Sequence, residues 1–295
     1  MTAVQPGILA GPAPAGRYLS FTLTHCEDTA LKQTLRQLAA ATDGERLVVG
    51  CGRSLAQRLG AEVPGLRTMP AYVGCGFDTP STPGALLLWL RGADRGEIVS
   101  RGRQLEAMLK PAFRVMLRVD GFRYDGGRDL TGYEDGTENP HDNEATGVVS
   151  VTGLGSGMEG STFLALQQWE HDFECFEAFD ADTRDNIIGR RRSDNEEIED
   201  APESAHVKRT AQESFDPEAF MLRRSLPWID GNRGGLMFSS FCRTLDAFEA
   251  QMDRMTGAED GIADALFMFS RVLNGAYYWC PGMKDGKLNL ALLKL

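Results

Sequence analysis

The chain has 295 residues, of which 42% are hydrophobic and 25% charged, the composition of a globular protein with one large domain or two ordinary ones. With 42 acidic against 31 basic residues, its net charge of -11 repels phosphate backbones and anionic lipid, which disfavours nucleic-acid and membrane binding. The longest uninterrupted apolar run, residues 85–90, is too short to span a bilayer.

The chain start and the cysteines indicate a cellular compartment. The first residues contain no basic segment and no apolar stretch, so we expect no secretory signal and a cytoplasmic location. The six cysteines are scattered and form no Cys-x-x-Cys pair, which argues against a zinc site or a thioredoxin-type motif. We expect most of them to be free thiols.

Hydrophobic spacing in the first half predicts alternating strands and helices. In chain order it predicts strand, helix, strand, strand, helix and strand at residues 18–23, 31–41, 47–49, 85–90, 97–109 and 113–119. Residues 60–84, rich in glycine and proline, are predicted to be irregular. This order is the ferredoxin-like βαββαβ arrangement.

The second half repeats the order less clearly, without a repeat in the sequence itself. Its predicted elements are a strand at 162–169, helices within 171–188, charged and irregular loops at 190–200 and 202–217, extended segments at 220–224 and 236–242, helices at 244–255 and 262–272, and a strand at 276–280. We therefore predict an α+β protein of two ferredoxin-like halves, residues 1–145 and 146–295.

A polar loop at residues 128–140, RDLTGYEDGTENP, follows the first half. Asn139-Pro140 closes it, because the residue before proline is kept out of the helical conformation. Gly132 and Gly136 permit close approach of the backbone to a flat ligand, and Asp135 between them could direct its carboxylate at that ligand. An ordinary acidic surface turn would give the same pattern.

This loop, with its Gly-x-x-Asp-Gly spelling, is similar to the distal-face signature of the dye-decolorising (DyP-type) peroxidases, a family of haem enzymes. The resemblance continues in IIGR at 187–190, SAHVKR at 204–209 and LRRSLP at 222–227, and is closest to the compact cytoplasmic bacterial branch. It implies a barrel-like arrangement of the two halves, as in dimeric α+β barrels. It also implies one haem b per chain, held largely by the second half, with the Asp135 loop folded over it.

Of the four histidines, the resemblance matches His206 to the proximal ligand of the haem iron. The other three are typical of surface or charged positions: His25, His141 and His171. The second ring nitrogen of His206 should donate to a carboxylate. Asp246 and Glu249 are candidates, although their spacing also fits a helix capping box.

Arg223 and Arg224 should point to opposite faces of a strand, and a buried arginine needs an anionic partner, either Asp135 or a peroxide oxygen. The resemblance places Arg223 with Asp135 on the distal face. There Asp135 would relay a proton between the peroxide oxygens and Arg223 would offset developing negative charge. Some relatives have asparagine where this chain has Ser225, which leaves open how far Ser225 assists.

Further cofactor-binding candidates are less specific. The resemblance favours Arg190 for a haem propionate, with Arg209 less securely placed, and the remaining polar candidates are Glu138 and Ser225. Leu236, Phe238 and Met255 would line the apolar slot, although at their spacing they could equally be plain core. Four aromatic residues are interpreted as packing residues rather than electron carriers: Trp228, Tyr277, Tyr278 and Trp279.

The resulting hypothesis is a peroxidase that uses hydrogen peroxide to oxidise dyes, phenols and similar small-molecule reductants. The alternatives are a porphyrin-handling protein without turnover and an RNA-binding or regulatory scaffold. The acidic composition disfavours RNA, and the presence of both Asp135 and Arg223 favours the enzyme. We also expect a homo-oligomer, with the apolar tail at 288–295 packed on a partner or on its own domain.

Overall fold

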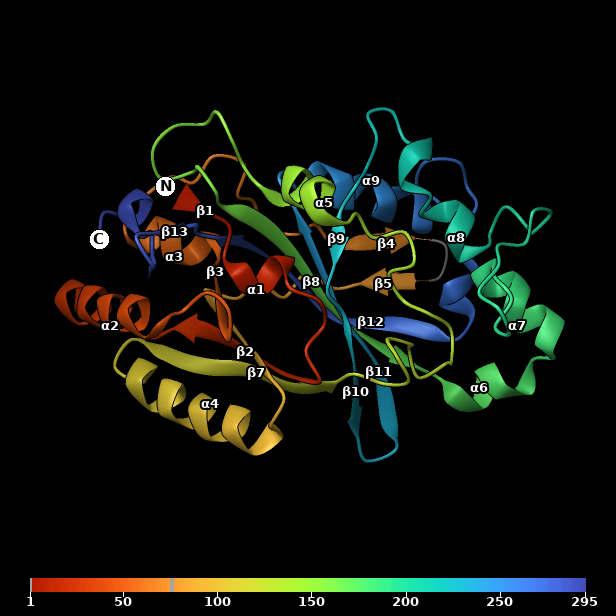
Figure 1. Ribbon diagram of the computed structural model, residues 1–295, viewed down its shortest axis with the longest axis horizontal. Coiled ribbons are helices and arrows are strands. Elements are labelled where there is room, and N and C mark those ends of the chain that lie inside the picture. Colours follow the sequence, from red (N-terminus) through yellow and green to blue (C-terminus); the bar gives the residue numbers. More distant parts are fainter. Residues whose placement is uncertain (1, 75–76) are drawn as a thin grey trace.

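The computed structural model describes residues 2–74 and 77–295 (Figure 1). Four antiparallel strands come from the first half: β2 (Ala15–Leu23), β3 (Leu47–Cys51), β6 (Leu86–Gly92) and β7 (Phe113–Phe122). They lie in the order β7-β2-β6-β3. This is the strand order of a ferredoxin-like unit, in which the first and third strands lie in the middle.

The second half contributes β8 (Thr162–His171), β10 (Leu226–Asp230), β11 (Arg233–Cys242) and β12 (Ser270–Cys280), in the order β12-β8-β11-β10. The two sets join twice, because Trp279 of β12 pairs with Cys51 and Trp228 of β10 pairs with Gly121. The strands thereby close into a barrel, with β9 (Leu222–Arg223) extending along the edge of β11. The predicted α+β fold with two ferredoxin-like halves is confirmed.

Most of the helices lie around the outside of the barrel (Figure 1). The longest are α2 (Asp28–Ala41), α4 (Arg95–Leu109) and α9 (Asp246–Met255). The shorter ones are α1 (Pro6–Leu9), α3 (Arg53–Arg58), α5 (Asp142–Val149), α6 (Phe173–Ala178), α7 (Ala181–Ile188) and α8 (His206–Arg209), with 3₁₀ turns η1 (Gln212–Ser214), η2 (Ala265–Met268) and η3 (Ala291–Leu293). Small additional strands are β1 (Thr2–Ala3), β4 (Tyr72–Gly74), β5 (Phe77–Thr79), β13 (Met283–Lys284) and β14 (Lys287–Leu288).

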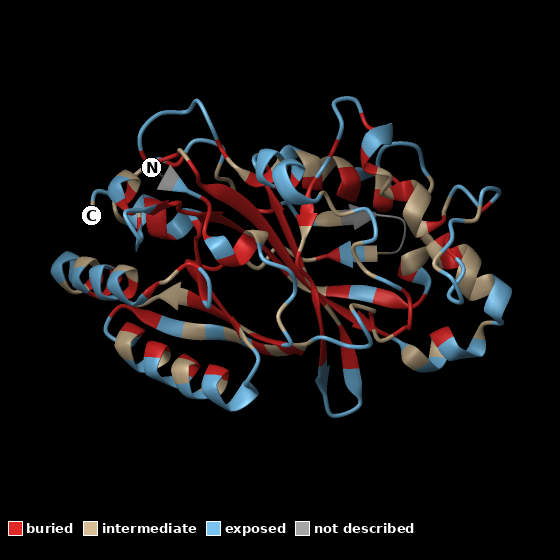
Figure 2. Cartoon of the chain, viewed as in Figure 1, coloured by how far each residue is buried: buried red, intermediate tan, exposed pale blue. Residues whose placement is uncertain are grey.

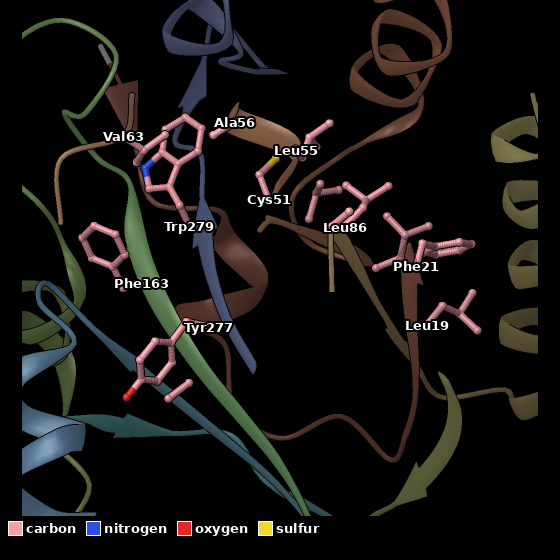
Figure 3. Close-up of a cluster of buried hydrophobic side chains, with 14 of the residues drawn as sticks. Leu19, Phe21, Cys51, Leu55, Ala56, Val63, Leu86, Phe163, Tyr277 and Trp279 are labelled. Carbon is pink, nitrogen blue, oxygen red and sulfur yellow. The ribbon is translucent and has the colours of Figure 1, made fainter. Parts of the chain in front are cut away.

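Side-chain alternation along the strands gives the protein two main cores, and the central strands β3, β6 and β8 are buried on both faces (Figure 2). The outer core lies between the strands and the helices, with Phe163, Tyr277 and Trp279 among its members (Figure 3). The inner core fills the barrel and includes Tyr18 stacked on Trp89. All four aromatic residues considered above for electron transfer are at most 4% exposed, as expected of packing residues: Trp228, Tyr277, Tyr278 and Trp279.

Three local predictions were wrong. The helix expected at 262–272 is only the short turn η2, because Ser270 already pairs with His171 in the ladder between β12 and β8. The segments at 202–217 and 60–84 were expected to be irregular, but they contain α8 and the β4–β5 pair. β10 had no clear strand signal, because Pro227 cannot donate a ladder hydrogen bond.

Other predictions concern the cysteines, the tail and the division of the chain. Five cysteines are free thiols and Cys75 lies outside the described residues. The tail packs on its own domain, since Leu288 and Leu293 are 5% and 0% exposed. The boundary after residue 145, which falls within α5, stays a proposal.

Among the helices of residues 2–74 and 77–295, none has the length and apolarity needed to cross a bilayer.

Candidate active site

A cavity opens between the 128–140 loop, α8, α9 and the strands β8, β9 and β11. Six residues singled out from the sequence line it: Asp135, His206, Arg223, Leu236, Phe238 and Met255. Its other walls include Trp169, Ile188, Phe248, Met252, Leu266 and Phe269. The cavity is therefore mostly apolar, with a few polar groups, as in sites that bind a flat organic cofactor.

The loop that carries Asp135 is a tight hairpin. The Asp129 N–H donates to the Tyr133 carbonyl at 2.8 Å, Arg128 pairs with Glu134, and the Asp135 N–H reaches the Gly127 carbonyl at 3.4 Å. Gly132 turns the chain with φ of 88°, where the guanidinium of Arg192 packs against it and leaves no room for a Cβ. The hairpin thereby directs residues 133–135 back along residues 127–129.

Asn139 fixes this loop to the strand that carries Arg223. Its side-chain amide accepts a hydrogen bond from the Arg223 N–H at 2.7 Å and donates to the Arg223 carbonyl at 3.1 Å. Asp135 and Arg223 therefore line the same cavity, although the structure shows no ion pair between them within the described residues. The Arg223 Nε is buried and has no hydrogen-bond partner among those residues, so this donor remains available to a ligand.

His206 is the first residue of α8 and its Nδ1 lies 2.8 Å from Oδ2 of Asp264, a fully buried carboxylate. Asp264 also caps η2 by accepting the Leu266 N–H at 2.8 Å. A donor bond from Nδ1 to this carboxylate leaves Nε2 as the nitrogen available to a metal.

The sequence predicted Asp246 or Glu249 as the partner of His206. The structure corrects this partner to Asp264. Both are bound to Arg67, with Nε 2.8 Å from a Glu249 oxygen and an outer nitrogen 2.5 Å from Asp246. The capping box is also absent from α9, whose N-cap residue Leu245 makes no side-chain cap. The sequence signal for Asp264 was only that of a helix cap, and this signal does not distinguish it from the other two acids.

The remaining cofactor candidates do not line the cavity, and their assignment stays a prediction. Arg190 lies 2.7 Å from Glu138 and 3.2 Å from Glu197. Arg209 forms two bonds to Asp260, at 2.7 and 2.8 Å. Ser225 is buried beside β11 and lines a neighbouring depression.

That depression reaches the surface beside the cavity and shares Glu134, Asp135, Arg223 and Leu236 with it. Arginines 123, 128 and 224 also line it. Burial and the nearby charge of Arg91 lower the pKa of Arg224 to about 10. The depression thus offers a small polar molecule a route from solvent to Asp135.

Comparison with known proteins identifies this architecture. Residues 126–285 match the family model of the DyP-type peroxidase C-terminal region. The chain belongs to the DyP-type peroxidase family. It is therefore an oxidoreductase of the peroxidase class.

Individual relatives match this chain over nearly its whole length. The dye-decolorizing peroxidase of Brevibacterium linens is 28% identical, with 96% of this chain and 83% of the relative covered. A putative DyP-type peroxidase structure from Shewanella oneidensis has a TM-score of 0.88 at 25% identity, covering 99% and 98% of the two chains. A variant of DypB from Rhodococcus jostii in complex with heme has a TM-score of 0.82 at 24% identity, covering 92% and 94%.

One part of this cavity was not predicted. His171, expected among surface charges, is the last residue of β8, and its side chain is only 5% exposed. Its Nε2 lies 3.3 Å from Asp129, and both residues line the cavity. Burial alone would raise the pKa of Asp129, but the charge and hydrogen bond of His171, with two hydrogen bonds from Thr131, lower it to about 2.

This shift predicts a specific pH dependence of stability. Because the pKa of Asp129 is depressed, its ionised carboxylate stabilises the folded protein at pH values above the ordinary pKa of 3.8. This stabilisation is lost as the pH falls through about 2. We expect wild type to have a higher free energy of unfolding than Asp129→Asn near neutrality, with the difference narrowing between about pH 4 and about pH 2. Urea unfolding of both proteins across this range measures it, and a difference that stays constant would contradict the assignment.

Proposed function

We propose that the protein is a haem peroxidase that binds one haem b in this cavity, with His206 as the iron ligand. The observation that carries the proposal is the combination of the His206–Asp264 pair with Asp135 and Arg223 on one apolar cavity. The heme bound by the Rhodococcus jostii relative supports it.

The residues present fit this group. Leu236 and Phe238 of β11, with Met255 of α9, provide apolar walls for a porphyrin. The Nε2 of His206 is left for iron, and the carboxylate of Asp264 makes the imidazole more electron-rich. When bound, haem supplies an iron that accepts the oxidising equivalents of peroxide and passes them to a reductant.

Peroxide cleavage requires a proton to move from one peroxide oxygen to the other, and the Asp135 carboxylate is the candidate carrier. The guanidinium of Arg223 offsets the negative charge that develops on the departing oxygen, and its unpaired Nε is a donor for that purpose. Asn139 holds the two groups together through the Arg223 backbone.

Arg190 remains our candidate for a haem propionate. Its present partners, Glu138 and Glu197, have side chains that are 62% and 53% exposed, so these ion pairs contribute little stability and a propionate could replace them. Arg209 stays a weaker candidate, because Asp260 already binds both ends of its guanidinium.

The reductants we propose are dyes, phenols and similar small molecules, oxidised at the expense of hydrogen peroxide. A cytoplasmic location and a homo-oligomer also stay predictions. A porphyrin-handling protein without turnover would need His206 and the apolar walls but not Asp135 or Arg223. The presence of both groups on the cavity supports the peroxidase.

The absorption spectrum tests the cofactor assignment. Purified wild type should show a haem spectrum that changes when one equivalent of peroxide is added. His206→Ala should lose most of its haem absorbance or shift it, because the axial nitrogen is gone. His141→Ala, at an exposed position, is the matched control and should keep the wild-type spectrum. An unaltered spectrum in His206→Ala would refute the ligand.

The carboxylate behind His206 has its own test. Asp264→Asn should lower the rate of peroxide reaction about 10- to 100-fold, because outer partners of a metal ligand contribute to this extent. Asp246→Asn, which only loosens the contact to Arg67, should react at nearly the wild-type rate. Stopped-flow absorbance measures both rates, and equal losses in the two variants would contradict the correction to Asp264.

The two distal groups can be ranked by the same measurement. We expect Arg223→Ala to lose about 10³-fold in the rate of peroxide reaction and Asp135→Ala about 10²-fold, because stabilisation of charge developing in the transition state is usually the largest single contribution. A larger loss in Asp135→Ala would reverse the ranking. Unchanged rates in both variants would refute the proposed distal site.

A further inference from the structure

A buried polar chain beside the cavity has no role in the steps above. Asp129 Oδ1 lies 3.3 Å from Nε2 of His171, and Nδ1 of His171 lies 2.7 Å from Oγ of Ser270. The Ser270 hydroxyl is also 3.3 Å from the Glu170 carbonyl. The chain links the 128–140 loop to the paired ends of β8 and β12.

Hydrogen bonds hold the His171 ring on both sides. The Asp129 carboxylate can only accept, so Nε2 must carry a hydrogen. Nδ1 is held by the Ser270 hydroxyl at 2.7 Å. A buried carboxylate such as that of Asp129 needs a hydrogen-bonding partner of this kind.

Within the described residues, Asp129 forms no ion pair other than the one with His171. The rings of Phe173 and Phe269 pack on the imidazole, at centroid distances of 5.8 and 5.6 Å. On β8, Glu170 is neutralised by Arg233 and Arg271. On α6, Asp172 is used as the N-cap, and in the loop Arg128 pairs with Asp125 and Glu134.

Asp129 is also the residue on which the hairpin turns. Its Oδ2 accepts from the Thr131 N–H at 2.9 Å and from the Thr131 hydroxyl at 2.7 Å, and its backbone bonds Gly132 and Tyr133. This turn sets the return strand of the hairpin, on which Asp135 lies. Through this turn, any movement of Asp129 is passed to Asp135.

We propose that His171 is a positioning residue that holds Asp129 and through it places Asp135 at the cavity. This inference rests on the proposed function for the role of Asp135. The pair anchors the loop to the barrel wall, whereas Asn139 anchors the same loop to β9.

A double-mutant cycle on the rate of peroxide reaction tests the positioning role. Asp129→Asn in the wild-type background should lose about 10- to 100-fold, the effect of a small misplacement of a reacting group. In the Asp135→Ala background the same change should lose less than about twofold, because residues that act through one group are not additive. Glu106→Gln, which breaks the exposed pair with Arg118, is the matched control and should leave the rate unchanged.

The outcomes separate the two proposals. Additive losses would overturn the positioning role and leave the peroxidase site intact. An Asp135→Ala variant that reacts like wild type would instead refute the distal assignment itself. Haem absorbance and urea unfolding of each variant show whether it is folded and loaded.

Discussion

The amide of Asn139 holds the 128–140 loop to β9 by two hydrogen bonds to the backbone of Arg223, and the proposed arrangement of Asp135 and Arg223 depends on this contact. Each bond by itself contributes only about 1 kcal/mol. Their effect is geometric, because they fix the spacing between a loop from the first half of the chain and a strand from the second. The barrel makes that spacing stable, since β10 joins β7 and β12 joins β3 across the two halves.

Three carboxylates around the cavity differ in their environment and therefore in their role. Asp264 and Asp129 are buried and each is paired with a histidine, so their charges are satisfied within the protein. Asp135 is only partly buried and has no such partner within the described residues. A carboxylate that moves protons must be able to change its charge, and the unpaired one is best suited to do so.

The strands and long helices were predictable because their hydrophobic spacing follows the geometry of the elements. Leu31, Leu35 and Leu38 of α2 are at most 1% exposed, as their spacing required. The short elements at the site were not predictable. A helix of four residues such as α8 has too few turns for a periodic pattern, and its position depends on tertiary contacts.

The residues on the cavity were recognised where a motif carries them, as for Asp135, His206 and Arg223. Their partners were not, because the partner of a side chain is chosen by tertiary structure. Asp246, Glu249 and Asp264 are similar acids in sequence, yet only Asp264 meets His206, because the turn η2 brings it to α8. Residues that hold a site in place thus leave a weaker sequence signal than residues that act in it.

The two histidine–aspartate pairs show how this difference arises physically. In the His206–Asp264 pair, one ring nitrogen meets the carboxylate and the other remains free for a ligand. In the Asp129–His171 pair, both ring nitrogens are used within the protein, by Asp129 and by Ser270. The first arrangement suits the proposed ligand, and the second suits the proposed anchor. The same two residue types therefore serve binding or positioning according to whether the second nitrogen finds a partner in the fold.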